Sequence, residues 1–192
     1  MRRTDVQHLP RRDRSRLSPR AHAEASMSDD ADIEAKVASA LEGLGAAHEV
    51  IRIDPGFADT AAFCEKYGVP PDHSGNTIIV ASKKEPKKFC ACLVLATSRL
   101  DVNHTVRRLM DVSRVSFATA DETKELTGMM IGGVTLLALP PDLPIYVEER
   151  IMALDYVILG GGSRSSKLKL APDVLRRVPN FRVVPGLALV AS

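Results

Sequence analysis

A chain of 192 residues, 45% of them hydrophobic, is long enough to bury one sizeable core, so a single domain is expected. The net charge of +2 is unevenly spread: residues 1–26 hold seven arginines against three acidic residues and carry +4, which leaves −2 on residues 27–192. A mildly acidic body argues against a DNA-binding protein. No run approaches the roughly 20 apolar residues of a membrane helix, and no signal-peptide core follows the arginines.

Residues 1–26 lack apolar periodicity and are predicted to be a disordered Arg-rich tail or leader, ahead of a single domain at residues 27–192. The tail is open to three interpretations: an arm that binds RNA phosphates, a transit-like peptide, or an over-long leader. The last is favoured because Met27 is followed by Ser28, Asp29 and Asp30, a natural start for the next helix.

The cysteines indicate the redox compartment. Cys64, Cys90 and Cys92 are an odd number, and the Cys-Ala-Cys spacing at residues 90–92 lacks the two-residue gap typical of zinc or redox pairs. On an extended segment Cys90 and Cys92 point to the same face, where each would behave as a small buried hydrophobe. A reducing cytoplasm is therefore the expected location.

The first half of the body alternates helical and extended patterns. Apolar residues at helical spacing and a closing Gly45 predict a helix over residues 31–44. An alternating strand at 48–53 and a short helix at 59–67 follow. Two apolar, β-prone runs at 77–81 and 89–96 are separated by a polar, lysine-rich segment, which predicts a hairpin of buried strands.

The second half is punctuated by glycine and proline. Asp101 is a good N-cap for a helix, a weaker strand and a short helix follow, and the chain closes with short strands around the three glycines at 160–162. Pro172 opens a last helical turn. Strands outnumber what a regular βαβ alternation would give, so the predicted fold class is α+β (mixed α/β), with a mixed, largely antiparallel sheet packed with helices.

Five segments in order resemble the YbaK/EbsC-type family, the free-standing relatives of the prolyl-tRNA synthetase editing domain. They include residues 72–80, whose Gly-Asn-Thr-Ile-Ile-Val lies where that family has a lysine followed by Thr and aliphatic residues, and residues 127–135, whose Gly-Met-Met-Ile-Gly-Gly resembles its glycine loop. The other three are 99–103, 144–148 and 159–168. The resemblance implies a trans-editing aminoacyl-tRNA deacylase that hydrolyses the ester of mischarged tRNA, and it implies no cofactor and no metal.

Partners follow from the same resemblance: the aminoacylated 3′ end of tRNA, and an aminoacyl-tRNA synthetase as a further candidate. The residues agree about metal, because the five histidines form no HxxxH pattern and no cluster with cysteine. Two alternatives stay open beside the hydrolase, namely a catalytically impaired module that binds aminoacyl-tRNA or a nucleotide, and an accessory domain that acts through a protein partner.

The expected catalytic positions are Asn76, Gly132, Gly133 and His73. By resemblance Asn76 occupies the place of the family's lysine, and a neutral amide cannot supply a fixed positive charge, although it can orient a water or the ester carbonyl. Gly132 and Gly133 would let backbone N–H groups approach a developing oxyanion. His73 is a second-choice general base, with a surface or capping role as the alternative.

The expected substrate-binding positions lie in the other resembling segments. They are Thr77 after the lysine position, Gly128 in the glycine loop, Glu148 as the family's acidic residue, and Ser163, Arg164 and Lys167 in the glycine-rich segment. Residues 160–167 invite a phosphate-loop interpretation, but they lack the Gly-Lys-Ser/Thr of a Walker A motif. Contact of Arg164 or Lys167 with a tRNA phosphate is the favoured hypothesis, and a plain basic turn is the alternative.

Overall fold

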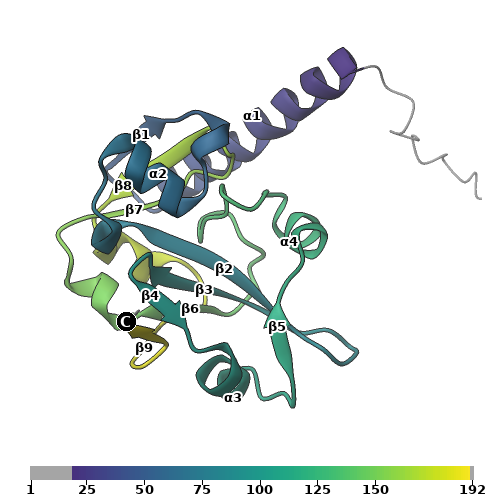
Figure 1. Ribbon diagram of the computed structural model, residues 1–192, viewed down its shortest axis with the longest axis vertical. Coiled ribbons are helices and arrows are strands. Elements are labelled where there is room, and N and C mark those ends of the chain that lie inside the picture. Colours follow the sequence, from purple (N-terminus) through teal and green to yellow (C-terminus); the bar gives the residue numbers. More distant parts are fainter. Residues whose placement is uncertain (1–18, 191–192) are drawn as a thin grey trace, which may run out of the picture.

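A five-stranded mixed sheet forms the centre of the protein, whose computed structural model describes residues 19–190 (Figure 1). Its strand order is β5-β2-β3-β6-β9, with β2 antiparallel to β3 and β5, and with β6 parallel to β3 and β9. The strands are β2 (Gly75–Ser82), β3 (Phe89–Leu95), β5 (Val115–Phe117), β6 (Ile145–Glu148) and β9 (Phe181–Val184). The predicted hairpin of two apolar strands is therefore the middle of this sheet.

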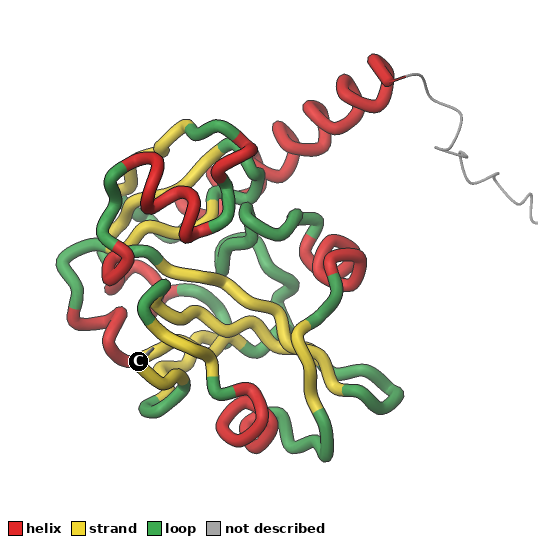
Figure 2. The backbone as a smooth tube through the Cα atoms, viewed as in Figure 1, coloured by secondary structure: helices red, strands yellow, loops and turns green. Residues whose placement is uncertain are grey.

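Two smaller sheets complete the β structure (Figure 2). The first is antiparallel in the order β1-β8-β7, and the second pairs β4 with β10. Their strands are β1 (His48–Arg52), β7 (Val157–Gly160), β8 (Ser166–Leu170), β4 (Ser98–Leu100) and β10 (Ala188–Val190). The predicted class, a mixed and largely antiparallel sheet packed with helices, is confirmed. Strands β4, β9 and β10 had no clear pattern in the sequence.

The helices are α1 (Pro19–Gly43), α2 (Thr60–Tyr67), α3 (Arg107–Leu109) and α4 (Ala120–Thr127), with a π-helical turn at Val102–Val106 leading into α3. Asp101 caps that turn, as predicted, by accepting hydrogen bonds from the N–H groups of His104 and Thr105. Further 3-10 turns lie at Pro55–Phe57, Pro71–His73, Glu149–Ala153 and Pro172–Arg177.

Helix α1 corrects one boundary. It begins at Pro19, well before the expected start at residue 31, and it runs across the expected division between residues 26 and 27. Residues 19–26 are thus helical, and the first 18 residues of the predicted tail lie outside the described part of the chain. The division into tail and domain stays a prediction.

The two faces of the large sheet bury different side chains because neighbours along a strand point to opposite sides. On one face Ile79 and Leu93 pack with Val37 and Leu41 of α1. On the other face Cys90 and Cys92 are fully buried in a second cluster, beside Val80, Val94, Val106 and Met110. The same-face burial predicted for these two cysteines is confirmed.

The start of β2 lies where the large sheet meets the three-stranded one. A bridge joins Ser74 to Ile158 of β7, and a Cβ on Gly75 would stand 2.8 Å from Leu159 and 2.9 Å from Leu93. A larger residue at Gly75 would require these two leucine side chains to shift. The first residues of β2 therefore lie beside α2 and β7, and this junction holds the candidate site.

Candidate active site

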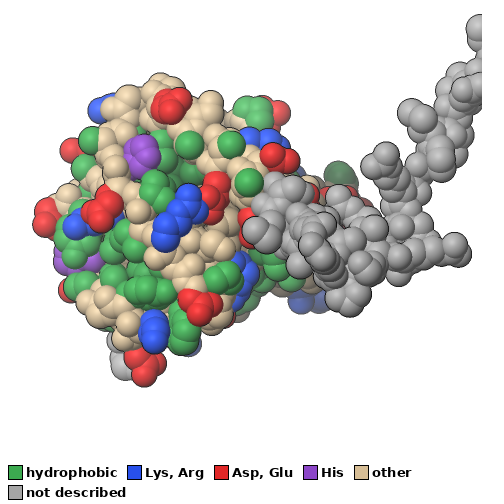
Figure 3. All heavy atoms as spheres, turned by 90° about the horizontal axis from the view of Figure 1, so that it is seen from above, with side chains coloured by type: hydrophobic (Ala, Val, Ile, Leu, Met, Phe, Trp, Pro, Cys, Tyr) green, Lys and Arg blue, Asp and Glu red, His purple; other side chains and the backbone are tan. Residues whose placement is uncertain are grey.

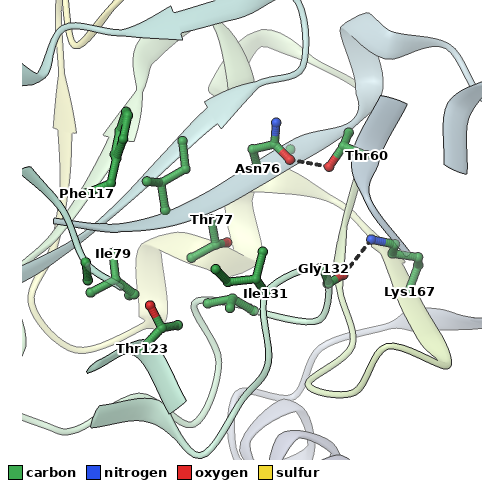
Figure 4. Close-up of a pocket in the computed structure, with 14 residues that line it drawn as sticks. Thr60, Asn76, Thr77, Ile79, Phe117, Thr123, Ile131, Gly132 and Lys167 are labelled. Atoms are coloured by element: carbon green, nitrogen blue, oxygen red, sulfur yellow. Dashed lines mark hydrogen bonds between the residues drawn. The ribbon is translucent and has the colours of Figure 1, made fainter. Parts of the chain in front are cut away.

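A cavity of about 270 Å³ opens between the start of β2, α2, α4 and the loop that precedes Val134 (Figure 4). Its polar end carries Thr60, Asn76, Gly132 and Lys167, whereas Ile79, Phe117 and Thr123 lie at the other end, with Thr77 and Ile131 between them. The remaining lining residues are Gly75, Ile78, Ala118, Val134 and Gly160. A mostly apolar hollow with a few converging polar groups is the common form of a small-molecule site.

Asn76 lines the cavity, and the oxygen of its side-chain amide is hydrogen-bonded within the protein. Thr60, the first residue of α2, donates its hydroxyl to Asn76 Oδ1. Asn76 Nδ2 then points away from Thr60 and keeps both of its hydrogens for a ligand (Figure 4). Thr60 was not among the predicted site residues, because it is 16 residues from Asn76 and is brought there by the packing of α2.

Thr77 contributes a hydroxyl that has no partner. Its Oγ1 is buried and makes no hydrogen bond within the described part of the chain, although the residue lines the cavity. An unsatisfied buried hydroxyl costs about 1–3 kcal/mol and is rare unless something else binds it. Thr77 therefore lines the cavity and has a hydroxyl without a partner among the described residues, and its substrate-binding role stays a prediction.

The two candidate glycines differ in what their N–H groups do. Gly132 lines the cavity with φ of +94°, and across residues 19–190 its N–H meets no acceptor. Gly133 N–H is donated to Met130 O at 2.9 Å, and Gly133 does not line the cavity. Its missing Cβ would stand 2.4 Å from Ser163 O, so Gly133 serves the close packing of two backbones. Of this pair only Gly132 has a donor to offer.

Arg164 and Ser163 lie behind the cavity instead of lining it. Arg164 donates to Ile131 O at 2.6 Å and Pro55 O at 3.0 Å, and its Nη1 lies 3.5 Å from Asp59 Oδ1. Ser163 Oγ donates to Glu34 Oε1 and accepts from Ser165 N–H. Arg164 thus holds the glycine loop against the turn before α2, and neither side chain meets the cavity.

Lys167 is the one cation among the residues that line the cavity. The residue is only 5% exposed, and its Nζ donates to Ala58 O at 2.7 Å and Gly132 O at 2.9 Å. Nζ also lies 5.2 Å from the centre of the Phe63 ring. Burial lowers the pKa of Lys167 to about 8, an effect that Arg164 strengthens and Asp59 opposes.

His73 lies away from the cavity, near its counter-ions. Nδ1 is 2.8 Å from Asp72 Oδ1, Nε2 is 3.2 Å from Asp155 Oδ1, and the ring stacks on Tyr156. The hydrogen bond to Asp72 raises the pKa of His73, which favours the charged imidazolium. Both ring nitrogens contact carboxylates and the residue does not line the cavity, so the arrangement matches the alternative of a surface role.

Glu148 and Gly128 also lie outside the cavity. Glu148 is 2% exposed and accepts hydrogen bonds from Leu95 N–H at 2.9 Å and Ser98 Oγ at 3.1 Å, beside an ion pair with Arg150. Gly128 ends α4 with φ of +75°. Both positions hold elements of the fold together, and their predicted contact with substrate has no support from their placement.

The described residues carry no sign of two other classes of site. No three His, Cys, Asp or Glu side chains within residues 29–190 are grouped so that they could hold a metal ion. No described helix is long and apolar enough to cross a membrane. On the face shown in Figure 3, acidic and basic side chains are interspersed and form no broad patch of one sign.

The family of this chain is shown by its similarity to known proteins. The sequence profile of the aminoacyl-tRNA editing domain matches residues 54–178, well over half of the chain. The chain belongs to the aminoacyl-tRNA editing domain family. The matched region contains every lining residue of the cavity, and the resemblance predicted from the five segments is confirmed. Its function is accordingly aminoacyl-tRNA deacylase-like, and no observation favours the alternative of a binding module.

Solved structures show the same fold. A protein described as hypothetical protein APE2540 has a TM-score of 0.71 and 25% identity, over 80% of this chain and 99% of that one. A proposed trans-editing enzyme for prolyl-tRNA synthetase has a TM-score of 0.68 and 24% identity, over 79% and 94%. A scaffold protein from an epitope-grafting design has a TM-score of 0.67 and 21% identity, over 79% and 95%.

The burial of Glu148 predicts a structural effect of its removal. Glu148→Ala leaves the buried Leu95 N–H without an acceptor, and we expect a loss of about 2–3 kcal/mol in the free energy of unfolding, measured with urea. Glu149→Ala, at the exposed neighbouring position, is the control and should change stability by less than about 0.5 kcal/mol. Unchanged stability with weakened substrate binding would instead assign Glu148 to the site.

The backbone contact at Gly133 predicts a second structural effect. Gly133→Ala drives a Cβ into the Ser163 carbonyl, which cannot move like a side chain, so we expect about 3 kcal/mol of destabilisation in thermal or urea unfolding. Gly43→Ala is the control, because an added Cβ there meets no atom within 4 Å and the position is helical. Equal stability of the two variants would contradict the packing role.

Proposed function

We propose that this protein hydrolyses, in trans, the ester between the terminal ribose of tRNA and an amino acid whose side chain is uncharged. The observation that carries the proposal is that Asn76, Thr77 and Gly132 line one largely apolar cavity, and each has a donor without a partner among the described residues. The amino-acid side chain would occupy the end formed by Ile79, Phe117 and Thr123. The ester would lie at the polar end, near Asn76 and Gly132.

A second hollow suggests where the nucleoside lies. It has a volume of about 410 Å³ and shares Thr60 and Asn76 with the first, so this pair forms the boundary between the two. Its other lining residues are Ala61, Cys64, Glu65, Val69, Pro71 and Ala96. An ester held at the boundary would direct its amino acid into one hollow and its terminal adenosine into the other.

The chemistry required is modest because an aminoacyl ester is already activated. A water oxygen attacks the carbonyl carbon, the C=O electron pair moves onto oxygen, and the bond to the ribose oxygen then breaks. The water supplies hydroxyl to the acyl carbon and a proton to the ribose oxygen, which gives a free amino acid and deacylated tRNA. Donors near the carbonyl oxygen stabilise the negative charge that develops there.

The finer assignments rest on the resemblance and on general arguments. We propose a YbaK-type trans-editing role that maintains translation fidelity, in a single domain at residues 27–192, with an aminoacyl-tRNA synthetase as a candidate partner. The described structure offers no patch dedicated to such a partner. A cytoplasmic location is supported by Cys64, Cys90 and Cys92, which are free, buried thiols.

The decisive experiment is a deacylation assay on the full chain with a panel of mischarged tRNAs. Loss of ester well above the spontaneous rate is expected for at least one of them. No deacylation of any tRNA above that rate would overturn the proposed function, and tight binding without turnover would favour the binding module.

Thr77→Val tests the site within that assay. Valine keeps the shape and removes the unpaired hydroxyl, so stability should be unchanged or raised by up to about 1 kcal/mol, while kcat/KM falls roughly tenfold. The measurement is thermal unfolding alongside deacylation kinetics. An unaltered kcat/KM would show that the hydroxyl meets no substrate atom.

Ala61→Phe tests the second hollow, because Ala61 is exposed on α2 and a ring there fills the space proposed for adenosine. We expect kcat/KM to fall about tenfold for aminoacyl-tRNA and aminoacyl-adenosine, and to stay unchanged for the ethyl ester of the same amino acid. Ala61→Ser is the control. An equal loss on all three substrates would place the nucleoside elsewhere.

A further inference from the structure

The family's lysine is missing from β2, yet the cavity is not without a cation. Lys167 of β8 reaches the same hollow from the opposite wall and lies at its polar end with Asn76 and Gly132 (Figure 4). Since the residue is almost fully buried, its charge is only weakly screened by solvent and interacts strongly with a nearby anion. Such a charge costs free energy to bury and is uncommon without a functional reason.

The bonding of Lys167 leaves part of its capacity unused. An ammonium carries three N–H donors, and Nζ donates two of them to Ala58 O and Gly132 O. Both acceptors are neutral carbonyl groups, and no carboxylate among the side chains described, those of residues 29–190, lies within 4.0 Å of Nζ. The positive charge is therefore solvated by the backbone but not neutralised, and one N–H remains for a ligand in the cavity.

We propose that Lys167 is the cation that stabilises the oxyanion formed during deacylation, supplied from β8 in place of a lysine on β2. This inference rests on the proposed function and adds a residue and a role to it. The third N–H of Nζ donates to the carbonyl oxygen as the attack of water converts this oxygen to an oxyanion. The negative charge leaves the oxyanion when the C=O bond re-forms and the bond to the ribose oxygen breaks. Lys167 thus touches the reacting atoms and counts as catalytic.

A second contribution comes through the glycine loop. Because Nζ binds Gly132 O, it fixes the loop whose Gly132 N–H is unpaired, and Arg164 holds the adjacent Ile131 O from outside the cavity. Ala58 O, on the turn before α2, ties the same ammonium to the element that brings Thr60 to Asn76. One side chain accordingly joins both walls of the polar end.

The ionisation of Lys167 makes the role measurable. The pKa of about 8 leaves the side chain mostly charged at neutral pH, and the groups that face it are Asp59 and Cys64 from the α2 region and Arg164 from the loop before β8. The oxyanion is stabilised by the ammonium form and not by the amine. The enzymatic rate should therefore decline as the pH rises through about 8, opposite to the spontaneous, hydroxide-driven loss of ester.

The test combines three variants of the full chain with the tRNA that the wild type deacylates. Lys167→Met should lower kcat/KM by about 100- to 1000-fold, the usual effect of losing one oxyanion donor. Lys169→Met is the matched control: it removes the same charge from the same strand, but that Nζ lies over the Tyr156 ring and outside the cavity. In Lys167→Met, the further change Asn76→Lys should restore at least tenfold by placing an ammonium on β2.

The pH profile gives a readout that a structural role would not produce. Lys167→Arg keeps its charge above pH 12, so its residual activity should lack the decline near pH 8 that the wild type shows. The substrate ammonium titrates equally in both proteins, and it cancels in the comparison. The wild-type profile needs no variant to fold, and thermal unfolding shows whether Lys167→Met remains native.

The outcomes separate this inference from the proposed function. An inactive wild type would overturn the function itself. An active wild type whose profile matches that of Lys167→Arg, or a folded Lys167→Met that keeps its activity within threefold, would overturn the role of Lys167 alone. Loss in Lys167→Met, recovery with Asn76→Lys and a wild-type decline near pH 8 would together establish it.

Discussion

The site depends on one buried ammonium that holds three separate segments together. Lys167 Nζ donates to the carbonyl of Ala58 before α2 and to the carbonyl of Gly132 in the glycine loop, while its own strand β8 belongs to the smaller sheet. A buried cation requires several acceptors to offset its lost hydration, so these contacts are demanded by its presence. The same demand draws the turn before α2 and the glycine loop toward each other around the cavity.

The residues around the cavity divide into those that build it and those that remain free to bind. Three of the candidate residues, Arg164, Ser163 and Glu148, use their polar groups in hydrogen bonds to other parts of the protein. Gly133 allows two backbone segments to pack closely because it has no side chain. Thr77, Asn76 and Gly132 line the cavity, and each has a donor without a partner among the described residues. Buried polar groups in folded proteins are almost always paired, and Thr135 has the other buried hydroxyl without a partner in the described part of the chain, outside the cavity.

The sheet explains why a change of side chain at Asn76 is compatible with the fold. Asn76 lies at the start of β2, on a half-buried stretch next to α2, while the later residues of the strand form the fully buried centre of the sheet. Its amide forms one side-chain bond, to Thr60, and does not carry the packing of β2. Chemistry at this position can therefore change without altering the arrangement of the strands.

The amino-acid sequence alone was enough to predict the local elements and the family. Continuous apolar runs predicted the central hairpin, Asp101 predicted a helix start, and the five resembling segments predicted the editing fold. These features are local, because turn chemistry, capping and the burial pattern of a strand are set by residues a few positions apart. It also placed Asn76, Thr77, Gly132 and Lys167 among ten candidate site residues, without distinguishing them from the other six, such as His73 and Glu148.

The folded arrangement was needed to learn which candidate residues share a cavity and which of their polar groups have partners within the protein. Thr60 meets Asn76, and Lys167 meets Gly132, through contacts between segments far apart in the chain. His73 and Glu148 carry the same side-chain types as catalytic residues, yet their neighbours commit them to ion pairs and hydrogen bonds elsewhere. The physical reason is that a donor or acceptor becomes available to a ligand only when the fold leaves it unpaired, and pairing depends on neighbours in space.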